Sequence, residues 1–269
     1  MSDLSKFIDH CHKELLIGKD REVELARRYL FDDRKLIENS LIHHKIGYCS
    51  SELVLPDPIR YYGTIDKNPN ERWNISRYIN GRIIVPIYSE FGELSAFATR
   101  VPTVEPGNPW WNLPSPFKKG NFLFLLDKAR KEIFKQNKIY VVEGYIDALM
   151  LFQHGITNVV GLMGTAYTLR KVALTTRYCN NVCLCFDTDE NKAGEKAKKM
   201  STVVLQKYNF CDSISVVDTL PMKEDPASFV AKNGTQPFLK MERNLSESEI
   251  NKICMEVSKG LTKEMLYAK

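Results

Sequence analysis

The sequence of 269 residues lacks any run of the roughly 18–20 apolar residues that a membrane-spanning helix requires. Its first segment, MSDLSKFIDHCHKELL, is polar and mixed in charge, unlike a secretory signal. It also lacks internal repeats and low-complexity segments. These absences predict a cytoplasmic protein with no membrane partner. Its composition is ordinary for a globular protein, at 43% hydrophobic and 26% charged residues, and its net charge of +5 permits a nucleic acid partner without requiring one.

The seven cysteines lack the CxxC or CxxH pairs that are typical of zinc sites. Cys183 and Cys185 alternate within the apolar run VCLCF, so we expect them to be buried in a strand. Cys11 lies between His10 and His12, which suggests a metal, but no second pair of ligands supports a site. We therefore expect reduced thiols in a reducing compartment and predict no zinc.

Three amphipathic helices are expected within residues 3–45, because apolar residues recur there three and four positions apart. Asp20 and Asp32 are candidate caps for the second and third of these helices. Two strand patterns follow, Arg82–Tyr88 and Glu93–Arg100, and the Ser-Glu-Phe-Gly turn between them predicts a hairpin.

A loop rich in proline and tryptophan covers residues 102–119, and a helix is expected near Asp127–Gln136. From Lys138 the pattern changes to strands alternating with helices, which predicts an α/β fold with a mainly parallel sheet flanked by helices on both faces. The expected strands lie within residues 138–143, 157–164, 181–189 and 213–220, and the expected helices within 144–155, 168–178 and 193–208. We expect three parts, namely a mixed α+β subdomain (1–137), an α/β domain (138–222) and a short helical tail (223–269).

Acidic residues close several of the expected strands. Glu143 ends IYVVE, Asp187 and Asp189 end VCLCFDTD, Asp218 ends SVVD, and Asp225 follows shortly after. Because the carboxyl ends of parallel strands share one edge of the sheet, these acids concentrate negative charge there. A hard divalent cation such as Mg²⁺ or Mn²⁺ would offset that charge. Each acid taken alone could instead be a helix cap or a turn residue.

Asp147 lies one helical turn beyond Glu143 and could face the same site, or it could simply stabilise the helix N-terminus. Gly144 leaves room for a ligand at the strand-to-helix turn. Gly161 and Gly164 would end the second strand without side chains that crowd the site.

Several motifs of this sequence resemble those of one protein family. VVEGYIDALMLFQHGITNVVGLMGTAYT, followed by NNVCLCFDTDENKAG, resembles the TOPRIM segment of DnaG-type bacterial and phage primases. GRIIVPIYSEFGELSAFATR, PFKKG and LPMKEDPASF resemble the hairpin, the Phe-x-Lys-Gly element and the Glu-Asp-Pro-Asp segment of the same family. The resemblance covers roughly residues 20–235.

The resemblance implies a primase that makes RNA primers on single-stranded DNA from ribonucleoside triphosphates, with two or more Mg²⁺ or Mn²⁺ ions. It implies that Glu143 is the catalytic glutamate and that Asp187 and Asp189 are catalytic metal ligands. Asp225 and Asp147 match further acids of the metal site. The residues matched to nucleic acid or nucleotide binding are basic or aromatic, and we take them to be Arg82, Arg100, Lys118, Lys119, Lys192, Trp110 and Trp111.

Several departures from the family pattern are visible. Ala227 replaces the second acid of the Glu-Asp-Pro-Asp segment, which would weaken one metal. The Lys-Tyr-x-Asn element appears as Pro109-Trp110-Trp111-Asn112, so the tryptophans would stack on template bases or cover a domain junction. An N-terminal zinc-binding module and a helicase-binding domain are not expected within this sequence. A replicative helicase or a separate zinc-module protein is a possible partner.

Two other interpretations stay open. A TOPRIM metal-dependent nuclease would use the same acids for cleavage. A primase-derived nucleic-acid-binding module without catalysis would fit Ala227 and the missing lysine, although it would not need clustered acids.

Overall fold

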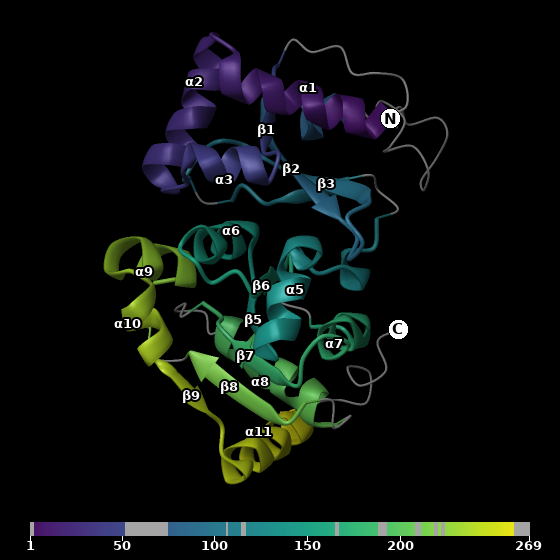
Figure 1. Cartoon of the computed structure of the whole chain (residues 1–269), viewed down its shortest axis with the longest axis vertical. Coiled ribbons are helices and arrows are strands. Elements are labelled where there is room, and N and C mark those ends of the chain that lie inside the picture. Colours follow the sequence, from purple (N-terminus) through teal and green to yellow (C-terminus); the bar gives the residue numbers. More distant parts are fainter. Residues whose placement is uncertain are drawn as a thin grey trace. The chain divides into compact units, whose positions relative to one another are not determined.

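The computed structural model describes residues 3–51, 75–105, 107–113, 117–164, 167–187, 193–207, 211–217, 220–221 and 224–260. The predicted site residues Asp189 and Lys192, together with Asp218, lie outside these described residues. Contacts divide the chain into two compact units, Met1–Lys119 and Gly120–Lys269, which Figure 1 shows in purple to teal and in teal to yellow. The division follows Lys119 and not residue 137, because the helix before residue 137 packs into the core of the second unit.

The first unit begins with helices α1 (Asp3–Ile17) and α2 (Arg21–Arg28), a π-helical turn (Tyr29–Asp33) and α3 (Glu38–His43). Asp20 is the N-cap residue of α2, as expected, although its side chain makes no capping hydrogen bond. The expectation for Asp32 is wrong. The helical path continues through Asp32 as the π-helical turn, and α3 begins at Glu38 with Ile37 as its N-cap residue.

A four-stranded antiparallel sheet completes this unit, in the order β1-β2-β3-β4. The predicted hairpin is confirmed by β2 (Arg82–Tyr88) and β3 (Leu94–Arg100). The short strands β1 (Gly47–Cys49) and β4 (Trp111–Leu113) were not predicted, and β4 lies inside the expected loop. Helix α1 packs closely on β1, since a Cβ at Gly47 would lie 2.6 Å from the carbonyl carbon of Cys11.

The second unit contains a five-stranded sheet in the order β6-β5-β7-β8-β9. Strands β5 (Lys138–Val142), β6 (Val159–Gly161), β7 (Asn181–Leu184) and β8 (Ser213–Val217) are parallel, which confirms the expected fold class. Strand β9 (Glu242–Asn244) adds antiparallel to β8 and was not predicted within the helical tail.

Helices α5 (Leu126–Gln136), α6 (Tyr145–Gln153), α7 (Leu169–Thr176) and α8 (Ala193–Lys207) lie at the predicted positions. The expected helical tail contains α9 (Pro226–Asn233), α10 (Thr235–Lys240) and α11 (Glu247–Gly260). No helix in the described part of the chain is both long and apolar enough for a membrane span.

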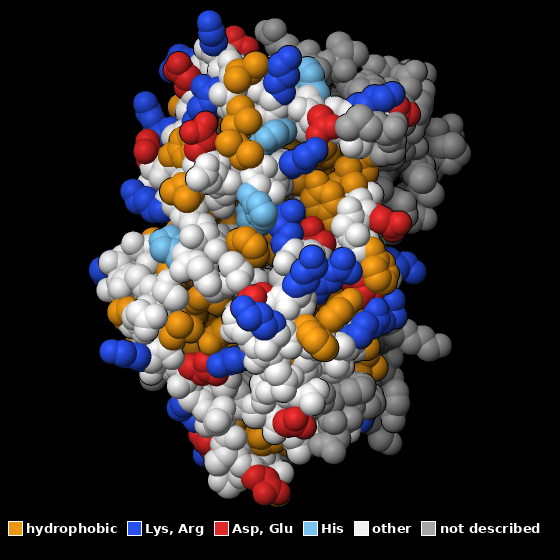
Figure 2. Space-filling view, viewed as in Figure 1, with side chains coloured by type: hydrophobic (Ala, Val, Ile, Leu, Met, Phe, Trp, Pro, Cys, Tyr) orange, Lys and Arg blue, Asp and Glu red, His pale blue; other side chains and the backbone are white. Residues whose placement is uncertain are grey.

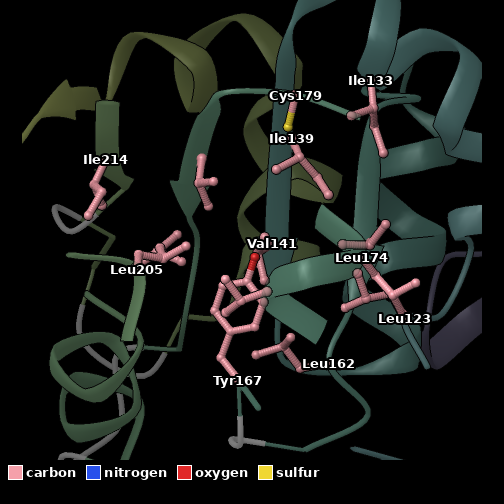
Figure 3. Close-up of a cluster of buried hydrophobic side chains, with 14 of the residues drawn as sticks. Leu123, Ile133, Ile139, Val141, Leu162, Tyr167, Leu174, Cys179, Leu205 and Ile214 are labelled. Atoms are coloured by element: carbon pink, nitrogen blue, oxygen red, sulfur yellow. The ribbon is translucent and has the colours of Figure 1, made fainter. Parts of the chain in front are cut away.

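Alternate residues of the parallel strands build a hydrophobic core on one face of the sheet. Ile139 and Val141 of β5 pack there with residues of α5, α7 and α8, including Ile133, Leu174 and Leu205, as Figure 3 shows. Strand β5 is also buried on its other face, because Tyr140 and Val142 are nearly inaccessible. This continuous burial explains why its sequence is apolar without alternation.

A hydrogen-bonded carboxylate fixes the added strand β9. Glu242 accepts hydrogen bonds from Lys138 Nζ at 2.5 Å, Tyr140 Oη at 2.9 Å and Ser215 Oγ at 2.6 Å. These donors come from β5 and β8, so three strands are tied together at one side chain. The chain after β8 is thereby held against the edge of the parallel sheet.

Candidate active site

The acidic edge lies beyond the carboxyl ends of the parallel strands. Glu143 directly follows β5, and Asp187 follows β7 after two further residues. The main chain of this extension is still paired with β5, since Cys185 N donates to Val141 O at 2.9 Å. Both acids are therefore delivered to the same edge by neighbouring strands, as the sequence predicted.

Gly194, in the first turn of α8, lies against the Glu143 carboxylate and the backbone of Asp187. A Cβ atom at position 194 would lie 2.2 Å from the backbone oxygen of Asp187 and 3.0 Å from Glu143 Oε1. Any side chain here would therefore clash with backbone. In the sequence, Gly194 appeared only as the last residue of the segment NNVCLCFDTDENKAG. The structure shows that glycine lets α8 approach the Glu143 carboxylate and the Asp187 backbone.

Helix N-termini also favour negative charge at this edge. The N-terminus of α8 lies against Glu143 and Asp187, and α6 begins two residues after Glu143. Glu143 Oε1 and Asp187 Oδ1 are both buried. The exposed N–H groups and dipole of a helix N-terminus offset part of the cost of burying such carboxylates.

Asp147 is buried and joins two helices. Its Oδ2 accepts a hydrogen bond from Gly144 N at 3.1 Å, at the start of α6, and its carboxylate also accepts one from the backbone N–H of Ala227, in the first turn of α9. Burial raises the pKa of Asp147 well above its ordinary value, and the nearby carboxylates of Asp187 and Asp225 raise it further. These contacts favour a positioning role at the helix N-termini over the predicted metal ligation, which stays a prediction.

Asp225 is the N-cap residue of α9. Its Oδ1 accepts from Ser228 N at 2.6 Å, and Ser228 Oγ accepts in return from Asp225 N at 3.1 Å. The neighbouring Ala227, which occupies the position of an acid in the resembling family, is buried. Its backbone N–H serves Asp147 instead. The effect of Asp225 on the pKa of Asp147 places it in the same group of acids.

A basic residue that the sequence did not indicate lies at the same edge. Lys171 of α7 is 1% exposed, and its Nζ donates to the backbone oxygen of Leu162, just after β6. The segment that follows is bonded to the site, because Gly164 N donates to Glu143 O at 3.1 Å. No sequence motif indicated Lys171, because lysine is rarely buried in a folded protein.

The oxygen donors at this edge suit Mg²⁺ or Mn²⁺, which prefer carboxylates. Within the described residues, no three acid, histidine or cysteine side chains form a complete metal site. Asp189, which the sequence predicted as the partner of Asp187, lies outside those residues. The buried oxygens of Glu143 and Asp187 therefore fit part of such a site in their chemistry.

The predicted nucleic-acid-binding residues of the first unit do not share one face of its sheet. Ile83 pairs with Arg100 across β2 and β3, and neighbouring residues of a strand point to opposite faces, so Arg82 and Arg100 lie on opposite faces. Trp110 lies with Arg100, whose guanidinium is 5.8 Å from its ring centroid. Trp111 lies on the face of Arg82.

Lys118 and Lys119 are exposed at the end of the first unit. On the face viewed in Figure 2, basic side chains are interspersed with exposed hydrophobic ones.

Comparisons with known proteins agree with these observations. Residues 140–230 match the family described as Toprim-like. A DNA primase of Clostridium acetobutylicum is 34% identical over 166 residues, which are 61% of this chain and 26% of the relative. The chain thus spans about a quarter of that relative's length.

Solved structures match over nearly the whole chain. The Aquifex aeolicus primase structure, with zinc-binding and RNA polymerase domains, has a TM-score of 0.75 and 25% identity, covering 96% of this chain and 64% of that one. The DnaG primase catalytic domain bound to single-stranded DNA has a TM-score of 0.73 and 24% identity, covering 99% and 90%. The resemblance seen in the motifs is therefore confirmed: this chain contains a Toprim-like segment and has the fold of the catalytic core of DnaG primases.

Proposed function

We propose that this chain is the RNA polymerase region of a DnaG-type primase, which synthesises short RNA primers on single-stranded DNA from ribonucleoside triphosphates. The observation that carries the proposal is that the Glu143 carboxylate and the Asp187 backbone lie against the same residue, Gly194, at the carboxyl edge of the parallel sheet. Acids from separate strands at one point suit phosphoryl transfer, in which catalysis depends mainly on positioning and on neutralising charge.

Glu143, Asp187, Asp189 and Asp225 would hold two or more divalent ions. When bound, these ions would orient the triphosphate and neutralise charge on the pyrophosphate that leaves. Glu143 would act beside the attacking 3′-hydroxyl, either as a ligand or as a general base that accepts its proton. Asp147 would keep the starts of α6 and α9 together, so that Glu143 and Asp225 stay in place.

The template would be held mainly through its phosphates. Arg82, Arg100, Lys118 and Lys119 supply positive charge in and after the first sheet, and Lys192 would contact the nucleotide. Binding that releases counterions weakens as salt rises. A bacterial or phage-infected cytoplasm is the setting that this function implies, with a replicative helicase or a separate zinc-module protein as further partners.

The test is primer synthesis from labelled ribonucleotides on single-stranded DNA, with Mg²⁺ or Mn²⁺. Glu143→Gln and Asp187→Asn should each lower the rate by at least about 100-fold, because each removes a charge from the reaction centre. Glu132→Gln is the matched control, since Glu132 is a partly exposed acid on α5 of the same unit, and it should keep full activity. Wild-type rates in both site variants would refute the assignment of the acids.

The same assay separates the other two interpretations. Metal-dependent cleavage of DNA without added nucleotides, lost in Asp187→Asn, would identify a nuclease. DNA binding without synthesis or cleavage would identify a binding module, for which the replacement of an acid by Ala227 is the specific supporting observation.

A further inference from the structure

We infer that Tyr78, Trp111 and Arg77 form a stacking site for an unpaired base of single-stranded DNA, on the face of the first sheet that carries Arg82. The choice of DNA rests on the proposed function, and the stacking geometry does not. Neither Tyr78 nor Arg77 was indicated by the sequence motifs. We call the three residues the aromatic platform.

Trp111 provides the open surface of the platform. It is the first residue of the edge strand β4 and is 41% exposed. Its ring centroid lies 4.7 Å from that of Tyr78, with an interplanar angle of 61°. This edge-to-face contact supports the indole on one side and leaves aromatic surface in solvent.

The platform is held in place by the sheet beneath it. Thr99 of β3 is fully buried and pairs with Trp111 in the strand register. Its Oγ1 donates to the backbone oxygen of Tyr78 at 2.6 Å. The backbone at both aromatic residues is therefore held by one buried threonine, and the two rings support each other, so little side-chain freedom would be lost when a base binds.

Positive charge lies beside the Tyr78 ring. The guanidinium carbon of Arg77 lies 5.6 Å from the centroid of Tyr78, and Arg82 Nε donates to the backbone oxygen of Arg77 at 3.2 Å. Guanidinium groups beside aromatic rings fit a nucleotide, because the ring stacks on the base while the cation meets the phosphate.

The Arg100 and Trp110 pair lies on the other face of the same strands, so it is a separate contact. A DNA strand that stacks on Trp111 therefore cannot stack on Trp110 along the same face of the sheet. The platform therefore accounts for Trp111 without requiring that the two adjacent tryptophans act together.

The experiment measures binding of the full chain to a fluorescent oligothymidylate by anisotropy, in EDTA and without nucleotides. Trp111→Ala should weaken binding about 5- to 150-fold, which corresponds to about 1–3 kcal/mol for one stacked base. Trp111→Phe should restore most of the affinity. Phe91→Ala is the matched control, because Phe91 is an aromatic residue of the same unit that is 67% exposed at the hairpin turn, and it should bind as wild type does.

An abasic oligonucleotide of the same length separates stacking from charge. The abasic oligonucleotide should bind wild type and Trp111→Ala with equal affinity. Arg77→Gln should lower the affinity for both the oligothymidylate and the abasic oligonucleotide, and should reduce the salt dependence of binding. Trp111→Leu keeps an apolar side chain at the sheet edge but has no aromatic face, so it should bind DNA as weakly as Trp111→Ala does. Its thermal unfolding midpoint should equal that of wild type, which would show that the loss of binding is not caused by misfolding.

Equal affinity of wild type and Trp111→Leu for oligothymidylate would overturn the inference. It would also be overturned if the Trp111 substitutions lowered the affinity for the abasic oligonucleotide as much as that for oligothymidylate. This result is independent of the proposed function. If the wild-type chain bound DNA in a base-dependent way but synthesised no primers, the proposed polymerase function would be wrong and the aromatic platform would stand. If it synthesised primers and Trp111→Leu bound DNA as wild type does, the aromatic platform would be wrong and the polymerase function would stand.

Discussion

Two groups of carboxylates in the second unit, one at the partly buried Glu242 and the other around the buried Asp147, are stabilised in opposite ways. At Glu242, burial opposes ionisation, but hydrogen bonds from Lys138, Ser215 and Tyr140 hold its pKa below the ordinary value. At Asp147, burial raises the pKa, and the neighbours Asp187 and Asp225 raise it further. A carboxylate that accepts several hydrogen bonds ties strands together in its ionised form. Carboxylates that lie close to one another are costly to ionise until a cation binds.

The largest expected effect on stability is at Glu242. Glu242→Ala leaves Lys138, Tyr140 and Ser215 without their shared acceptor, and we expect the free energy of unfolding to fall by about 3 kcal/mol. Urea denaturation followed by circular dichroism measures it. Glu132→Ala, at a partly exposed position on α5, is the control. An unchanged midpoint would mean that β9 is held by other contacts.

Divalent ions should stabilise the acids at the other group. Mg²⁺ at about 100 times its dissociation constant should raise the free energy of unfolding by about 2.7 kcal/mol. This gain should vanish in Asp187→Asn and persist in Glu242→Ala. The measurement is thermal unfolding across a Mg²⁺ titration. A similar gain in Asp187→Asn would show that the ions bind elsewhere.

The dependence of stability on pH should have opposite signs at the two groups. The pKa of Asp147 is raised on folding, so its contribution is present below the ordinary aspartate pKa of about 4 and is lost as pH rises through the higher folded value. The pKa of Glu242 is lowered, so its contribution is present above about 4.3 and is lost as pH falls through the lower folded value. Each slope is limited to about 1.4 kcal/mol per pH unit for one proton.

Urea denaturation of wild type, Asp147→Asn and Glu242→Gln in EDTA tests this contrast. The stability of wild type relative to Asp147→Asn should fall with rising pH above about 4. Relative to Glu242→Gln, it should fall with decreasing pH below about 4. If the stability differences of the two variants from wild type changed with pH in the same direction, the proposed contrast between the two groups would be wrong.

The sequence predicted the parallel strands well because each is a continuous apolar run between helices with clear periodicity. It missed β1, β4 and β9, which are three residues long. Unlike β6, which is equally short but lies in a longer apolar run, these strands show no recognisable pattern, and their existence depends on a partner strand. For β9 the partner contact is the set of hydrogen bonds around Glu242, from residues about a hundred positions away.

The site was predicted in part for the same reason. Glu143 and Asp187 follow apolar strands, so their common edge could be inferred. The contact between Tyr78 and Trp111 could not, because it joins segments that are distant in sequence. The burial of Lys171 could not either, because a lysine is rarely buried in a folded protein.

The sequence by itself determined the alternation of strands and helices, and with it the edge at which Glu143 and Asp187 gather, since parallel strands all end on the same side. Tertiary structure alone decided which acids are engaged by backbone donors and which face of the first sheet each basic residue occupies. The physical reason is that periodicity is local, whereas burial and hydrogen-bond partners are supplied by distant parts of the chain.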